Sequence, residues 1–122
     1  MSAPSLIGPS FLAFVVDDVA AASLFWTNVV GLKPAAQSPP GAQVFQTSPI
    51  PIAVRVPRAG EVLGSGQGLA PWFSVSGDVD EFREVLLQRG AHVGELQDGP
   101  FGRMFILFAP GGFVVTVHAG AP

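Results

Sequence analysis

Cysteine is absent from this 122-residue sequence, and charged residues make up only 12% of it. Without cysteine the chain has no disulfide framework, no thiolate metal site and no cysteine nucleophile. Six Lys and Arg residues against nine Asp and Glu residues give a net charge of −3. Because phosphate binding needs a basic stripe, this composition argues against nucleic acid as a partner.

Signals for export and for membrane insertion are also missing. The N-terminus lacks a basic region followed by an apolar run, and no stretch approaches about 18 uninterrupted apolar residues. We therefore expect a cytoplasmic protein with no membrane partner. Charge is scarcest in residues 1–50, which carry only Asp17, Asp18 and Lys33. So little charge predicts that part of this half is covered by a second subunit in a homodimer.

Hydrophobic residues, at 48%, suffice for a sizeable core in one domain or in two fused half-size modules. The elements expected in the first half are a strand over residues 11–16, a cap at Asp17-Asp18, a helix over residues 19–30 that stops at Gly31, and strands at 42–47 and 51–56. Bulky β-prone residues predict the strands, and the cap and stop residues bound the helix.

The second half repeats this order of elements. Its expected elements are a strand over residues 70–75, a helix over 79–89 that stops at Gly90, and a hairpin of strands 103–108 and 113–118 around the turn Ala109-Pro110-Gly111-Gly112. The Gly/Ser-rich segment between the halves has the composition of a linker. We therefore predict an α+β fold of two tandem βαβββ modules, residues 1–60 and 69–122, joined at 61–68 into one domain.

Several short motifs also occur in a characteristic order. They are Val16-Asp17-Asp18, Phe25-Trp26 and Gly31-Leu32 in the first half, then Gly90-Ala91, Pro100-Phe101-Gly102-Arg103 and Ala109-Pro110-Gly111-Gly112 in the second. On these motifs, from about residue 9 to 118, the chain resembles the vicinal oxygen chelate superfamily. That superfamily includes glyoxalase I, extradiol dioxygenases, fosfomycin-resistance enzymes and bleomycin-resistance proteins. The resemblance implies a cup-shaped mixed sheet with helices on its outer face, usually completed in a homodimer.

Most enzymes of this superfamily hold a divalent metal with His and Glu side chains that face the cup. The resemblance puts Phe11, Ala53 or Arg55, Ala70 and Thr116 at the expected ligand positions. None of these is a competent ligand, and Thr116 offers at best a weak neutral oxygen. The remaining likeness is closest to the bleomycin-resistance-like branch, which sequesters its ligand without metal or chemistry. We therefore expect no metal and no cofactor.

Strand alternation, combined with the resemblance, predicts which residues face the cup. The candidate ligand-binding residues are Phe11, Ala13, Arg55, Trp72, Ser74, Phe101, Thr116 and His118. Aromatic side chains suit a planar ligand, but they are equally common in cores and dimer interfaces. Arg55 is the one charge in an apolar strand. It is either an anchor for a carboxylate or phenolate, a cation–π partner, or an edge residue that reaches solvent.

Three functions remain open at this point. The first is a metal-free protein that binds a small, aromatic or largely apolar metabolite or antibiotic in a homodimer. The second is a lyase, isomerase or dioxygenase that uses a displaced metal or the side chains of Arg55, Thr116 and His118. His118 is the candidate general base, although no neighbouring carboxylate in the sequence orients it. The third is a dimeric interaction module without a ligand.

Overall fold

The computed structural model describes residues 4, 6–7, 9–61, 63, 69–100 and 102–119. The first half contains β1 (Leu12–Val15), α1 (Val19–Leu24), the π-helix η1 (Phe25–Val30), β2 (Lys33–Pro34), β3 (Ala42–Gln46) and β4 (Ile52–Arg55). The second half contains β5 (Trp72–Val75), α2 (Val79–Gln88), β6 (Gln97–Gly99), β7 (Gly102–Ala109) and β8 (Phe113–Ala119). The same order of strand, helix and three strands therefore occurs twice, which confirms the predicted α+β fold.

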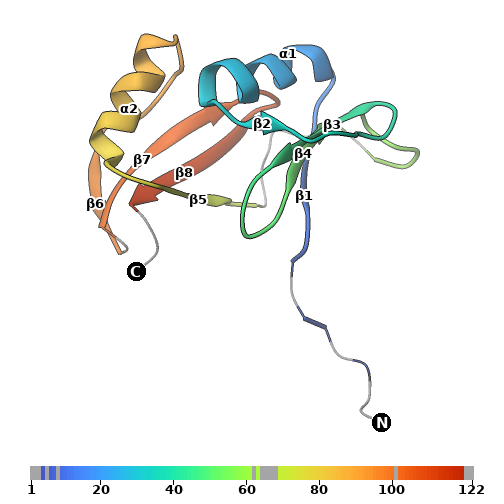
Figure 1. Cartoon of the computed structure of the whole chain (residues 1–122), viewed down its shortest axis with the longest axis horizontal. Helices are drawn as coiled ribbons and strands as arrows, with labels where there is room; N and C mark the ends of the chain where they lie inside the picture. The colour runs from blue at the N-terminus through green and yellow to red at the C-terminus, as the bar shows by residue number, and fades with distance from the viewer. Residues whose placement is uncertain are drawn as a thin grey trace.

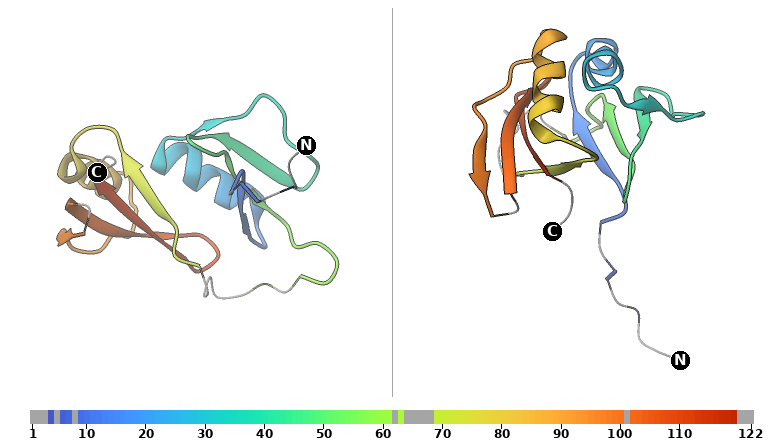
Figure 2. Two further views of the ribbon diagram at one scale, coloured as in Figure 1. Left: turned by 90° about the horizontal axis from the view of Figure 1, so that it is seen from below. Right: turned by 60° about the vertical axis from the view of Figure 1, so that its left-hand side comes forward.

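Each module builds its own four-stranded mixed sheet. Sheet A has the strand order β1-β4-β3-β2, and sheet B has the order β5-β8-β7-β6. In each sheet the first and last strands of the module pair in parallel, and the other neighbours are antiparallel. Figure 1 shows α1 and α2 together on one side of the two sheets, and the right view of Figure 2 shows the same layering. We call the sheet face away from the helices the cup face.

The helices begin and end at the residues that the sequence favours. Asp18 accepts a hydrogen bond from the backbone N–H of Ala21 at 3.0 Å, and Asp78 caps α2 in the same way. The first helix closes at Gly31, whose φ of 94° is in the left-handed region. Its second half, however, is a π-helix rather than the continuous α-helix that we predicted.

A side-chain hydrogen bond gives a physical reason for the change from α-helix to π-helix. The Thr27 hydroxyl donates to the carbonyl of Ser23 at 2.8 Å, and so competes with the backbone for that acceptor. Two backbone N–H groups, those of Gly31 and Leu32, then converge on the carbonyl of Trp26. The wider turn accompanies the complete burial of Trp26, which is 1% exposed.

One hydrophobic core lies between the helices and sheets and is shared by both modules. Its buried members are Phe14, Val16, Ala22, Trp26, Phe45, Ile52, Val54, Val79, Leu86, Phe105, Leu107, Ala109, Val115 and Val117. Aromatic rings cross the junction, since the centroids of Phe14 and Phe113 are 4.8 Å apart and those of Trp26 and Phe73 are 5.9 Å apart. Edge-to-face and offset rings of this kind stabilise beyond their buried area, so the two modules pack as one body.

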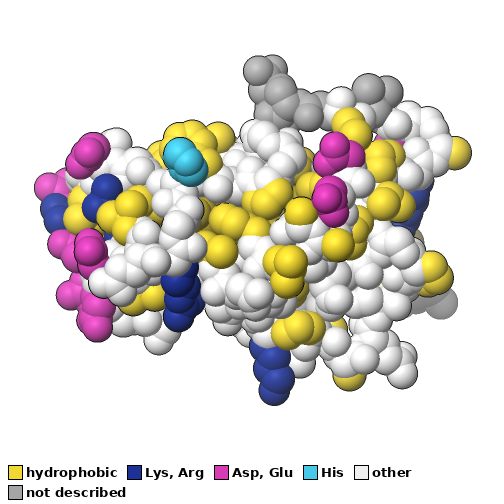
Figure 3. Space-filling view, turned by 90° about the horizontal axis from the view of Figure 1, so that it is seen from above, with side chains coloured by type: hydrophobic (Ala, Val, Ile, Leu, Met, Phe, Trp, Pro, Cys, Tyr) yellow, Lys and Arg dark blue, Asp and Glu magenta, His cyan; other side chains and the backbone are white. Residues whose placement is uncertain are grey.

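A hydrogen bond joins the two modules, and charged side chains are distributed unevenly over the surface. The Arg89 guanidinium donates to the carbonyl of Val29 at 3.1 Å, which joins the end of α2 to η1. Acidic side chains gather at the α2 end of the molecule, mixed with Lys and Arg, and a further acidic pair lies at the start of α1 (Figure 3). No helix in the described parts of the chain is long and apolar enough to cross a membrane.

Candidate functional site

A cleft of about 620 Å³ opens at the junction of the two modules. The first module contributes residues before and at the start of β1, the connection from β3 to β4, and Leu32 and Ile52. The second module contributes residues 69–74, which lead into and form most of β5. The size falls within the usual range of small-molecule sites, about 300 to 1,000 Å³.

Four positions singled out from the sequence line this cleft: Phe11, Ala70, Trp72 and Ser74. Phe11 lies just before β1 and Ala70 just before β5, so these two flank the strands in which we expected them. Phe11 is 48% exposed and Trp72 is 41% exposed. Two aromatic side chains, one from each module, therefore present free surface to the same space.

Thr116 and His118 lie directly beside this group, on the strand next to β5. In the parallel register Trp72 pairs with Thr116, and Ser74 pairs with His118. The Trp72 and His118 ring centroids are 5.7 Å apart. Both β8 side chains are buried, at 7% and 9% exposure, so they support the Trp72 wall rather than line the cleft.

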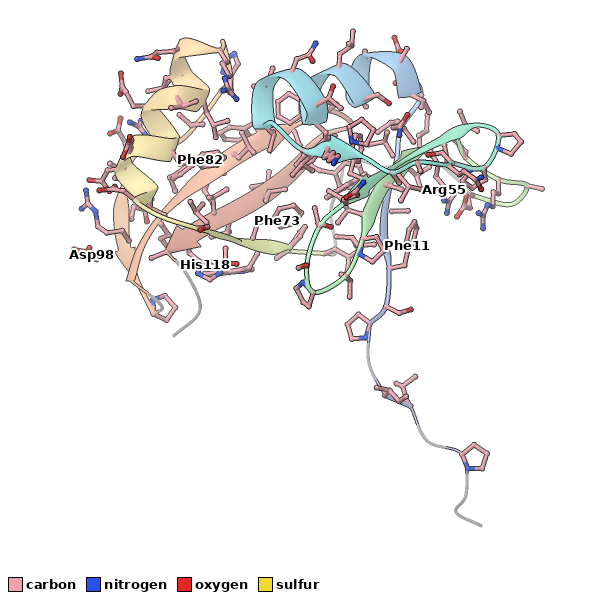
Figure 4. All side chains as sticks on the ribbon, viewed as in Figure 1. Phe11, Arg55, Phe73, Phe82, Asp98 and His118 are labelled. Atoms are coloured by element: carbon pink, nitrogen blue, oxygen red, sulfur yellow. The ribbon has the colours of Figure 1, made fainter. Side chains whose placement is uncertain are left out.

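The other predicted positions lie elsewhere or cannot be placed. Ala13 pairs with Ala53 on the cup face of sheet A, and neither residue lines the cleft. Arg55 lies two residues after Ala53 on β4, beside the loop that follows this strand (Figure 4). Arg55 is therefore on a different sheet from Thr116 and His118, and the three do not form one acid–base cluster within this chain. Phe101 lies outside the described residues.

Arg55 makes a two-pronged ion pair that the sequence did not reveal. Its Nη1 and Nη2 atoms lie 2.6 and 2.7 Å from the two carboxylate oxygens of Glu61. The hydrogen bond from Arg55, followed by one from the Arg58 backbone N–H, lowers the pKa of Glu61 from 4.5 to about 2. Arg55 is not on an edge strand as one interpretation had it, because β4 lies between β1 and β3 in the sheet.

The residues at the usual metal positions do not fit a divalent ion. Phe11, Ala53 and Ala70 end in hydrocarbon, and Thr116 supplies only a neutral hydroxyl. Nowhere in residues 9–61, 69–100 and 102–119 do three His, Asp or Glu side chains gather closely enough to hold a metal. Divalent ions need several imidazole or carboxylate donors, so these positions supply no metal chemistry.

Part of the cleft wall was not foreseen from the sequence. Gln46 at the end of β3 and residues 47–50 of the connection to β4 form this wall, with the polar side chains of Gln46, Thr47 and Ser48. The side-chain amide of Gln46 donates to the carbonyl of Pro34, which fixes one side of this wall. No periodic pattern marks such a loop, because its approach to β5 depends on how the two modules pack.

Comparison with known proteins identifies the family. The model of the Glyoxalase/Bleomycin resistance protein/Dioxygenase superfamily matches residues 8–117. No curated protein matches the sequence.

Solved structures share the fold at low sequence identity. TnmS3, an antibiotic binding protein from Streptomyces sp. CB03234, has a TM-score of 0.75 at 19% identity and covers 98% of this chain and 100% of its own. The bleomycin-binding protein of Streptomyces verticillus, complexed with copper(II)-bleomycin, gives 0.71 at 19% identity, with 97% and 99% covered. Lactoylglutathione lyase from Agrobacterium tumefaciens gives 0.72 at 22% identity, with 97% and 96% covered. The chain belongs to the glyoxalase/bleomycin resistance protein/dioxygenase superfamily.

Proposed function

We propose that this protein is a metal-free binder of a small, planar and largely apolar molecule, which it holds in the cleft between its modules. The observation that carries the proposal is the pair of half-exposed aromatic side chains, Phe11 and Trp72, that face this cleft from different modules. A planar ligand between them covers both rings at once. Ser74 and the polar side chains of residues 46–48 orient its edge.

The chemistry of the cleft wall narrows the ligand class. None of the residues described as lining the cleft is charged. A strongly cationic ligand therefore finds no carboxylate there, and its desolvation is not offset. A neutral aromatic metabolite or antibiotic fits the wall better. Two proteins of similar fold, an antibiotic binding protein and a bleomycin-binding protein, support an antibiotic among the candidate ligands.

We further propose that the protein works as a cytoplasmic homodimer. On the cup face of sheet B, Phe108 and Val114 lie opposite each other in register and are 50% and 42% exposed. Near the N-terminus, Leu6 and Ile7 are almost fully exposed. Apolar surface of this extent on a chain with so little charge favours cover by a second copy.

Variants of the two aromatic side chains test the ligand site. The exposed 41% of Trp72 corresponds to about 100 Å² of ring surface, given roughly 250 Å² for a tryptophan. When a ligand buries this Trp72 surface, the binding free energy gains at most ~2.5 kcal/mol at about 25 cal/mol/Å², which is about 70-fold in affinity. We therefore expect Phe11→Ala and Trp72→Ala each to weaken binding of the neutral planar dye Nile red by about ten- to seventyfold, measured by fluorescence titration.

Leu24→Ala is the matched control. Leu24 is 59% exposed on α1, on the helix side of the molecule, and does not line the cleft. This variant should bind Nile red as the wild type does. Equal losses in all three variants, or no loss in Phe11→Ala and Trp72→Ala, would show that the dye binds elsewhere and would refute the proposed site. A panel of aromatic metabolites and antibiotics, competed against the dye, then identifies the ligand.

A further inference from the structure

Arg55 is a cation built into the face of a sheet. It lies on β4, an inner strand of sheet A, and its register partners are Val15 on β1 and Ala42 on β3. Its side chain is only 16% exposed among these apolar neighbours. A guanidinium in such surroundings needs an anion, because an unpaired buried charge is costly.

The anion comes from a loop and not from the sheet. Glu61 follows Arg55 by six residues, and both of its carboxylate oxygens meet the guanidinium in the fork geometry typical of carboxylate recognition. One of these oxygens also accepts the backbone N–H of Arg58 at 2.7 Å. Among the described residues that follow Val56 in this loop, Glu61 is the one hydrogen-bonded to sheet A, through its carboxylate.

The ion pair of Arg103 and Asp80 is also two-pronged, but its exposure and its position in the fold differ from those of the Arg55–Glu61 pair. Arg103 on β7 binds Asp80 on α2 at 3.2 and 2.8 Å, so both partners sit on regular elements. Their side chains are 47% and 48% exposed, as in an ordinary surface pair. In the Arg55 pair the cation is on an inner strand and its side chain is only 16% exposed, whereas the carboxylate belongs to the loop that follows this strand.

A small cavity lies at the end of β1, the strand that pairs with β4 at Arg55. A cavity of about 200 Å³ is lined by Val15, the register partner of Arg55, together with Val16, Asp17, Leu63 and Gly111. A cavity of about 150 Å³ is enough for a benzene ring. Leu63 lies two residues after Glu61 in the sequence, so a wall residue of this cavity and the partner of Arg55 are close along the chain.

We propose that Arg55 is a binding site for the carboxylate of a small organic acid, and that Glu61 occupies this site as an internal competitor. An incoming carboxylate replaces that of Glu61 on the same two guanidinium nitrogens, and its apolar body rests on Val15. The site goes beyond the function proposed above, because Arg55 does not line the cleft.

Removing the internal competitor tests this proposal. If the Arg55–Glu61 ion pair is broken in about a tenth of the molecules, only that tenth can bind a carboxylate, and the apparent affinity is about tenfold weaker. We therefore expect Glu61→Gln to bind benzoate about tenfold more tightly than the wild type in isothermal titration calorimetry at low salt. Benzamide, which has the same ring without the charge, should bind equally to both proteins. The double variant Arg55→Gln/Glu61→Gln should lose the gain.

Asp80→Asn provides a control matched in charge. It also removes one negative charge and frees an arginine from a two-pronged pair, but on the exposed helix surface. It should bind benzoate no better than the wild type. Equal benzoate affinity in Glu61→Gln and wild type, or an equal gain in Asp80→Asn, overturns the proposal. Nile red binding to the same samples keeps this result separate from the cleft, since it should be unchanged in Glu61→Gln.

Discussion

Trp26 should hold the two modules together as one cooperative unit. It belongs to the first module, is 1% exposed, and stacks on Phe14 with ring centroids 5.4 Å apart. Its ring also lies 5.9 Å from that of Phe73 in the second module. Trp26→Ala therefore removes contacts to both sheets at once and leaves a cavity at their junction.

The expected cost is large compared with the stability of a domain. Replacing a buried tryptophan by alanine costs about 3–5 kcal/mol, from a total of about 5–15 kcal/mol. With a urea m-value of about 2 kcal/mol/M, a loss of about 4 kcal/mol lowers the unfolding midpoint by about 2 M. Because the core is shared, this loss should affect the second module as much as the first.

The chain offers a simple assay, since Trp26 and Trp72 are its two tryptophans and lie in different modules. Trp26→Phe keeps an aromatic side chain in the core, and Trp72 is then the sole fluorescent reporter in both variants. We expect the Trp72 transition to shift with Trp26→Ala and to coincide with loss of far-UV circular dichroism. An identical Trp72 midpoint in the two variants would mean that the modules unfold independently, and it would refute the reasoning.

Two further predictions concern charge and assembly. The carboxyl carbon of Glu61, followed by NMR, should titrate near pH 2 in the wild type and at a higher pH in Arg55→Gln, still below 4.5 because the Arg58 backbone N–H continues to lower the pKa. Because the folded-state pKa is lowered, the ion pair is fully present above about pH 4.5 and is lost as the pH falls through about 2. Phe108→Asp should convert the proposed dimer to a monomer in light scattering, because it puts a charge on the exposed cup face of sheet B. A dimer that persists in Phe108→Asp would exclude this face as the interface.

The sequence predicted the elements of this fold because each carries a local signal. Alternation of apolar residues marks β7 and β8, and the Pro-Gly-Gly turn between them needs no tertiary information. Asp18 and Gly31 bound the first helix for reasons of capping and left-handed φ. The tandem arrangement followed once these signals were found twice in the same order.

The site was only partly predictable, because its assembly depends on packing between modules. Strand parity correctly grouped Trp72 and Ser74 with Thr116 and His118, since all four positions follow from one register. It could not show that a loop at residues 46–50 closes the cleft or that Glu61 binds Arg55. Glu61 lay in a stretch with linker composition, and an ion pair across a loop leaves no periodic trace in a sequence.

The two modules share a topology but present different chemistry at equivalent places. In the parallel pair of sheet A the cup face carries Ala13 against Ala53, whereas sheet B carries Trp72 against Thr116 at its parallel pair. With small side chains beside it on sheet A, the proposed site there depends on a charged group, Arg55. The proposed site at sheet B depends on the contact area of aromatic side chains instead. One duplicated unit can therefore supply an apolar cleft and a separate anion site. For a ligand that carries both an aromatic ring and a carboxylate, its affinity for Glu61→Gln shows which site it uses, because only binding at Arg55 should become tighter.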